Sequence, residues 1–239
     1  MSEIKNVENG NGGYQGGAPT NRAVTPGGHP LDSTQPAFPV YHRKFANPAP
    51  LGLMAFAATT FVLSMYNVQA RGVSAPNVVT GLAVGYGGTA QFIAGVWEFA
   101  SGNTFGATAF CSYGAFWWSF AAILIPWFGI ETAVPEGELN SALGIYLSAW
   151  FIFTFIMFVA SFRSSVGLVL LFGLLDITFL LLFIGYFVGN ESRATMVTKA
   201  GGGFGIATAA VAWYVGAAGL LTPDTSYFTL PVIELSRRD

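Results

Sequence analysis

The sequence predicts an all-α integral membrane protein built from six transmembrane helices. Only 9% of its 239 residues are charged and 53% are hydrophobic, whereas about 25% of the residues in a soluble domain are charged. Apolar runs also recur along the chain with lengths of about 20 residues, which is what a helix needs to cross a bilayer core. Short connections between the runs favour a compact helical bundle.

The chain divides into three parts by composition. Residues 1–44 are rich in Gly, Asn, Pro and Thr and lack the apolar segment of a signal peptide, so they predict a disordered cytoplasmic tail. Residues 45–221 form the expected transmembrane domain, and residues 222–239 a cytoplasmic C-terminal tail. The expected spans lie near 50–67, 78–100, 105–128, 142–161, 166–188 and 200–221.

The first span follows an unusual stretch, Asn47–Leu53, with the sequence NPAPLGL. Pro48 and Pro50 interrupt helical hydrogen bonding, yet the apolar run begins at Leu51. We expect irregular backbone here, covered by protein or water, with free N–H groups at the start of a helix. Such groups form an anion site. The candidate residues are Asn47, Pro48, Ala49, Pro50, Leu51 and Gly52.

The later spans have their own boundary and packing signals. Pro76 and Asn77 begin the second span, residues 102–104 separate it from the third, and Pro126 predicts a kink or stop near the end of the third. Glycines at helical spacing predict faces where helices, or neighbouring subunits, approach closely. They are Gly81, Gly85, Gly88 and Gly95 in the second span, and Gly201, Gly202, Gly203 and Gly205 in the sixth.

The basic residues predict the orientation of the bundle. With six spans, the basic residues next to the first, fourth, fifth and sixth spans lie mostly on one side of the membrane. This side is expected to be cytoplasmic. Both termini then lie inside the cell. The residues concerned are Arg43, Lys44, Arg163, Arg237 and Arg238, whereas Arg71, Arg193 and Lys199 fall on the other side.

Two carboxylates lie within expected spans, where ionisable groups are costly and point to function. Glu98 shares a helix face with Gln91, seven residues earlier, and is either a proton-linked or gating group or an interfacial carboxylate bonded to a helix end. Asp176 either lines a pathway or carries a proton, or it forms a structural hydrogen bond with Thr154 or Thr178.

Other residues exclude several classes of site. The chain has one cysteine, Cys111, and its two histidines, His29 and His42, precede the first span, so no metal site, cofactor or hydrolytic catalytic group is expected within the membrane. The chain has no basic patch suited to nucleic acid. Tyr113 lies mid-span among small residues and requires a hydrogen-bond partner for its hydroxyl.

Several motifs occur together in a characteristic order. They are NPAPLGL at Asn47–Leu53, Tyr86-Gly87-Gly88 with Gln91, Trp97-Glu98, Asn103-Thr104-Phe105-Gly106, and Ser112-Tyr113-Gly114 with Phe116-Trp117. With these motifs the chain resembles the acetate uptake transporter family, which includes bacterial succinate–acetate permeases and fungal acetate and ammonia-export proteins. The resemblance covers residues 45–221 and is strongest to the fungal type.

The resemblance implies a six-helix subunit in a homo-hexamer, with a pore through each subunit. It also implies a multi-pass protein of the plasma membrane, in contact with lipid and not with nucleic acid. The family's pore narrows at an apolar and aromatic constriction, which falls on Phe56, Tyr113 and Leu175 of this chain. Asp176 follows that leucine where Thr or an apolar residue is expected, so its role stays open.

The function implied by the resemblance is transport of acetate and related small monocarboxylates, by a channel or by proton-linked symport. An apolar neck resists hydrated ions, and crossing with a proton avoids burying a bare charge. Two alternatives are a sensor of acetate that regulates acid tolerance through the tail, and an exporter of ammonium or ammonia. The expected substrate-binding residues are Asn47–Gly52, Gln91, Asn103 and Thr104.

Overall fold

The computed structural model describes residues 46–235, and it confirms an all-α fold. The expected tail 1–44 and the last four residues lie outside the described residues. The elements are α1 Ala49–Asn67, η1 Ala70–Gly72, η2 Pro76–Val78, α2 Val79–Val84, η3 Gly85–Ala90, α3 Gln91–Ser101, α4 Thr104–Leu124, η4 Pro126–Phe128, α5 Ile130–Ala133, α6 Leu139–Ala160, η5 Ser161–Arg163, α7 Val166–Phe187 and α8 Glu191–Leu220.

Within residues 46–235, five helices are long and apolar enough to cross a membrane: α1, α4, α6 with η5, α7 and α8. The expected second span is instead a succession of α2, the π-helical turn η3 and α3. The Thr89 hydroxyl donates to the Val84 carbonyl at 2.7 Å, and Trp118 Nε1 donates to the same oxygen at 3.2 Å. Both bonds satisfy the Val84 carbonyl oxygen, which lies at the start of the π-helical turn η3. The count of six spans stays a prediction.

The start of α1 differs from the expectation of irregular backbone around the two prolines. The helix already begins at Ala49, with Pro48 as its N-cap and Pro50 in its first turn. Proline costs little there because the first N–H groups of a helix have no intrahelical acceptor. Asn47 Oδ1 accepts a bond from the Ala49 amide at 3.1 Å. The expectation of a non-helical entry was therefore wrong.

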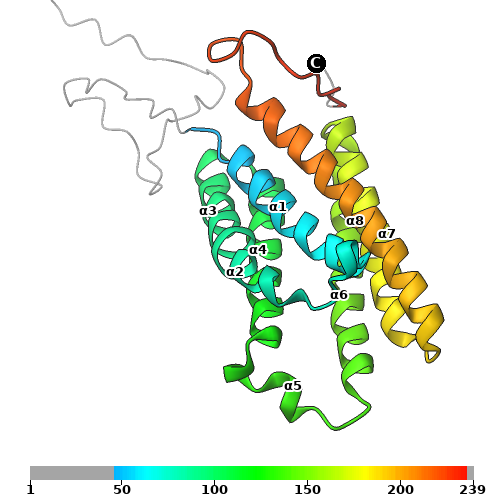
Figure 1. Cartoon of the computed structure of the whole chain (residues 1–239). Coiled ribbons are helices and arrows are strands. Elements are labelled where there is room, and N and C mark those ends of the chain that lie inside the picture. The colour runs from blue at the N-terminus through cyan, green and yellow to red at the C-terminus, as the bar shows by residue number, and fades with distance from the viewer. Residues whose placement is uncertain (1–45, 236–239) are drawn as a thin grey trace, which may run out of the picture. The chain divides into compact units, whose positions relative to one another are not determined.

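Helix α8 packs along α1 and α7, α6 packs on α7, and α3 packs on α4 (Figure 1). Small residues allow this close approach. A Cβ added to Gly95 of α3 would lie 2.6 Å from the Cys111 amide nitrogen of α4, and one added to Gly202 of α8 would lie 2.9 Å from the Ser64 carbonyl of α1. By contrast, a Cβ added to Gly81 would meet no heavy atom within 4 Å.

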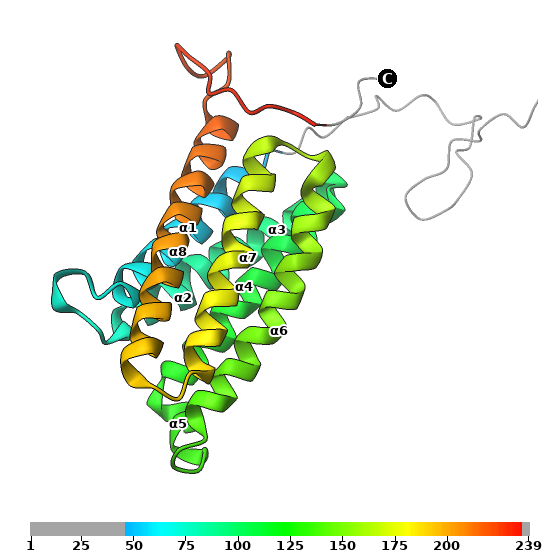
Figure 2. The same cartoon turned by 90° about the vertical axis from the view of Figure 1, so that its right-hand side faces the viewer.

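One end of the bundle gathers the starts of α1, α4 and α7 and the end of α8, whereas α5 lies at the opposite end (Figures 1 and 2). After α8 the chain turns back across the first of these ends. The Val166 amide donates to the Ile233 carbonyl at 2.8 Å, and the Leu235 amide donates to the Ser164 carbonyl at 2.9 Å. The described part of the C-terminal tail is therefore packed against the turn between α6 and α7.

Candidate functional site

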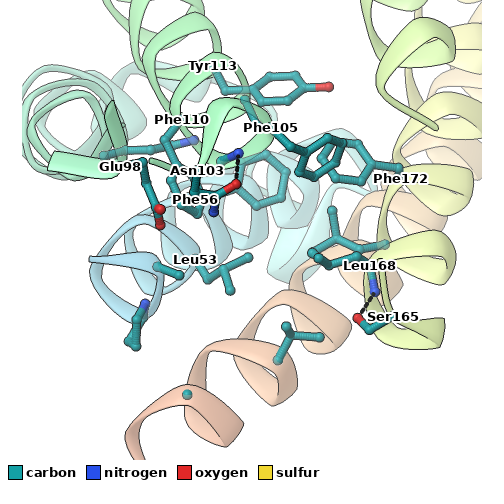
Figure 3. A pocket seen from close by; sticks show the side chains of 18 of the residues that line it. Leu53, Phe56, Glu98, Asn103, Phe105, Phe110, Tyr113, Ser165, Leu168 and Phe172 are labelled. Carbon is teal, nitrogen blue, oxygen red and sulfur yellow. Dashed lines mark hydrogen bonds between the residues drawn. The ribbon is translucent and has the colours of Figure 1, made fainter. Parts of the chain in front are cut away.

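A cavity of about 250 Å³, here called the first chamber, lies at this end of the bundle between α1, α3, α4, α7 and α8 (Figure 3). Its walls are mainly apolar, with a few polar groups among them. The lining includes Ala49, Pro50, Leu53, Phe56, Gln91, Glu98, Asn103, Phe105, Phe110, Tyr113, Leu168, Phe172 and Leu175.

A smaller cavity of about 70 Å³, the second chamber, lies deeper in the bundle. Its lining includes Thr60, Ser64, Asn67, Trp117, Phe179, Tyr186 and Thr198. Beyond it lies a vestibule of about 660 Å³ at the α5 end, which shares Asn67, Tyr186 and Thr198 with the second chamber. The three cavities form a row through the helical bundle.

Phe56, Tyr113 and Leu175 line both chambers and separate them. All three are buried, with 5%, 3% and 3% of their surface exposed. The rings of Phe56 and Tyr113 lie with their centroids 5.7 Å apart. The structure thus brings together, from α1, α4 and α7, the three residues that the resemblance alone had grouped.

Tyr113 is held in place by its hydroxyl group. Its oxygen lies 2.9 Å from Thr154 Oγ1 of α6, and both residues are buried. The ring also packs edge-on against Phe153, with centroids 5.3 Å apart. The hydrogen-bond partner predicted from the sequence is therefore present. It fixes the direction in which the tyrosine ring projects between the chambers.

Two buried polar side chains face the first chamber. Gln91 and Glu98 are 1% and 2% exposed. The Oε1 atom of each side chain has no hydrogen-bond partner among the described residues. The other Glu98 oxygen accepts a bond from the Ser101 hydroxyl at 3.2 Å. A buried polar atom without a partner is costly unless a ligand or water satisfies it. These two oxygens therefore offer acceptors to a bound molecule.

The remaining predicted residues are placed in different surroundings. Of the Asn47–Gly52 stretch, only Ala49 and Pro50 line the first chamber. Leu51 is 44% exposed, and Gly52 packs on the Phe110 ring, so neither faces the chamber. Asn103 does line it and caps α4, since its Oδ1 accepts from the Gly106 amide at 3.0 Å, whereas the adjacent Thr104 is exposed.

Asp176 lines neither chamber. Its Oδ1 atom is buried without a hydrogen-bond partner in the part of the chain that the structure describes. The two threonines expected as partners bond elsewhere: Thr154 pairs with Tyr113, and the Thr178 hydroxyl donates to the Leu174 carbonyl at 2.8 Å. The carboxylate is thus set back from the row of cavities.

Two residues of the second chamber were missed by the sequence reasoning. Thr60 Oγ1 and Trp117 Nε1 are buried without partners among the described residues, and both side chains line this chamber. Thr60 follows Phe56 by four residues and Trp117 follows Tyr113 by four. Residues four apart lie on the same helix face, so this spacing was the signal that could have identified them.

The surrounding helices and the row of cavities with an apolar neck define a membrane channel or transporter. The chain belongs to the GPR1/FUN34/yaaH family, which matches residues 30–237. This confirms the family that the motifs indicated. Among residues 46–235, no three His, Cys, Asp or Glu side chains are grouped to hold a metal ion.

Relatives of known name support this class. The chain is 52% identical to ammonia transport outward protein 2 of Saccharomyces cerevisiae over 198 residues, covering 82% of this chain and 69% of the relative. It is 50% identical to acetate permease A of Emericella nidulans over 198 residues, covering 80% and 66%. The solved structure of the bacterial acetate channel SatP matches with a TM-score of 0.70 and 36% identity, covering 79% and 99%. The names describe transport proteins and a channel, not enzymes.

Proposed function

We propose that this chain carries acetate and related small monocarboxylates across the plasma membrane through the row of cavities. The observation that carries the proposal is the shared wall of the two chambers. A molecule moving between them must pass Phe56, Tyr113 and Leu175. The named activities of acetate permease A and of the SatP channel agree with this assignment.

The polar groups on the two sides of the neck suit two protonation states of the substrate. The free Oε1 atoms of Gln91 and Glu98 in the first chamber accept a hydrogen bond, as the O–H of a carboxylic acid requires. The Trp117 N–H in the second chamber only donates, and the Thr60 hydroxyl can donate, as a carboxylate requires.

Passage as the neutral acid lowers the cost of crossing the apolar neck. A small carboxylic acid resembles the Glu side chain, whose pKa is about 4.3, so most of it is charged at neutral pH. Burying a bare carboxylate among apolar side chains is expensive. We assign the proton-linked role to Glu98, which lines the first chamber, and leave Asp176 outside the route.

Removing the donors of the second chamber is expected to slow uptake. Thr60→Val and Trp117→Phe each delete one hydrogen bond to a charged group, which corresponds to roughly a tenfold loss of affinity. Initial rates of acetate uptake at low concentration measure the effect. Thr59→Val is the matched control, because the Thr59 hydroxyl bonds to the Ala55 carbonyl and lines neither chamber. Equal rates for Thr60→Val and Thr59→Val would contradict the role of Thr60.

Uptake of labelled acetate into proteoliposomes, with and without an inward proton gradient, tests the function itself. Accumulation above equilibrium only with the gradient would establish proton-coupled symport. Equilibration without a gradient would establish a channel. The absence of uptake under both conditions would overturn the proposal and favour the sensor hypothesis, in which the tail 1–44 transmits the signal.

The proposal includes a homo-hexamer surrounded by lipid. Large apolar side chains on the spans point away from the bundle, such as Ile152 and Ile156 of α6 and Ile177 of α7, which are 59%, 59% and 38% exposed. Lipid or neighbouring copies of the chain would cover them. Light scattering of the purified protein, corrected for detergent, gives the mass of the assembly and contradicts the hexamer if another multiple is found.

Export of ammonia is a second candidate, favoured by the name of the yeast relative. Both histidines of the chain precede residue 46, so the described helices offer no imidazole to an ammonium ion. The same proteoliposomes, loaded with a pH-sensitive dye, distinguish the two activities. A protein-dependent pH change after an ammonium pulse would support ammonia transport. A change only after an acetate pulse would support carboxylate transport alone.

A further inference from the structure

The C-terminal segment Pro231–Leu235, here called the strap, lies across the turn that begins α7. Ser165 and Glu234 form an antiparallel bridge, flanked by the two backbone hydrogen bonds between the strap and Ser164 and Val166. The Tyr214 hydroxyl of α8 donates to the Pro231 carbonyl at 2.8 Å. The strap is thus attached to both α7 and α8, although it lies outside the spans.

The strap also contributes to the wall of the first chamber. Val232 lines this chamber together with Ser165, the N-cap of α7, with Leu168 of α7, and with Val215 and Gly219 of α8. These neighbours lie at the end of the bundle where the chamber meets the outside. A residue of the C-terminal tail therefore forms part of the mouth through which a molecule reaches the neck.

We propose that the strap is a movable wall of this mouth and that Val232 controls access to the first chamber. This inference rests on the proposed transport function for its physiological meaning. Among the described residues, three hydrogen bonds join the strap to the helices and the turn before α7. Its apolar side chains are only partly covered: Val232 is 36% exposed, Ile233 65% and Leu235 40%. The strap can therefore move without unfolding a helix.

Tyr214→Phe tests the strap without altering the chamber, because Tyr214 does not line it. Loss of one hydrogen bond shifts an equilibrium between two positions of the strap roughly fivefold. The readout is the rate at which a thiol reagent modifies Leu168→Cys in purified full-length protein carrying Cys111→Ala. We expect modification to become about fivefold faster with Tyr214→Phe.

The control in this experiment is Tyr227→Phe, the same substitution at a fully exposed position between α8 and the strap. It is expected to leave the modification rate unchanged. Equal rates for the Tyr214 and Tyr227 variants would overturn the inference. The modification rate does not depend on transport, so this experiment decides the role of the strap even if the protein carried no acetate.

A reversible disulfide provides the transport arm. Opposed residues of an antiparallel pair have Cα atoms about 4.5–5.5 Å apart, which suits a disulfide, so Ser165→Cys with Glu234→Cys fixes the strap in a Cys111→Ala background. Oxidation is expected to reduce acetate uptake, and reduction of the same sample to restore it, which excludes misfolding. Unchanged uptake on oxidation would overturn the inference. Absent uptake in wild-type protein would instead count against the proposed function.

Discussion

Leu175→Trp is expected to reduce acetate uptake to the level of protein-free vesicles, and Leu175→Ala to raise it. Leu175 separates the two chambers together with two aromatic rings, so an indole in its place fills the gap between them. Alanine widens the gap, and a roughly tenfold faster passage would correspond to a barrier lowered by about 1.4 kcal/mol. Larger monocarboxylates are expected to gain more than acetate does. Initial uptake rates for acids of increasing size measure both effects.

Leu180 provides the matched control on the same helix. It is partly buried in α7 but lines neither chamber. Leu180→Ala and Leu180→Trp are therefore expected to leave the uptake rate close to that of the wild type. If the Leu175 and Leu180 pairs behave alike, or if Leu175→Trp still transports, the neck lies elsewhere.

Gly95→Leu is expected to prevent stable packing of α3 on α4. An added Cβ would already lie 2.6 Å from the Cys111 amide nitrogen and sulfur, which is closer than atoms in van der Waals contact. Backbone cannot give way as a flexible side chain does, so the helices must separate. Overpacking usually costs about 1–3 kcal/mol and occasionally more. The melting temperature and the monodisperse fraction in detergent measure the loss.

Gly81→Leu tests whether the effect comes from contact rather than from glycine itself. Gly81 lies in the same expected span, but its surroundings are open. The substitution is expected to leave the melting temperature unchanged or slightly raised, because leucine favours a helix more than glycine does. Equal destabilisation by both variants would contradict the close packing of α3 on α4.

The sequence predicted the all-α fold because long apolar runs favour helices, and five of these runs are helices long enough to cross a membrane. It could not predict the details at places where local rules compete. Pro48 and Pro50 suggested an irregular entry to the first span, but at a helix start they are compatible with regular backbone. At the start of the π turn Gly85–Ala90, the Val84 carbonyl accepts a hydrogen bond from Trp118, a distant residue of α4. No periodicity in the second span reveals that contact.

The candidate site likewise contains residues that helical spacing can identify and residues that only the tertiary structure brings together. The grouping of Phe56, Tyr113 and Leu175 came from the family resemblance, because no spacing relates residues on three separate helices. Thr60 and Trp117 could have been derived from them by helical spacing. The strap could not, since the contact of Val232 with the first chamber depends on how the chain turns after α8.

The most direct test of the proposed passage is a reversible block at the neck. Leu175→Cys in a Cys111→Ala background places the one thiol of the chain between the chambers. Modification with a small methanethiosulfonate reagent is expected to reduce acetate uptake into proteoliposomes to the protein-free level, and reduction of the mixed disulfide to restore it. Undiminished uptake by the fully modified protein would show that acetate does not pass between Phe56, Tyr113 and residue 175.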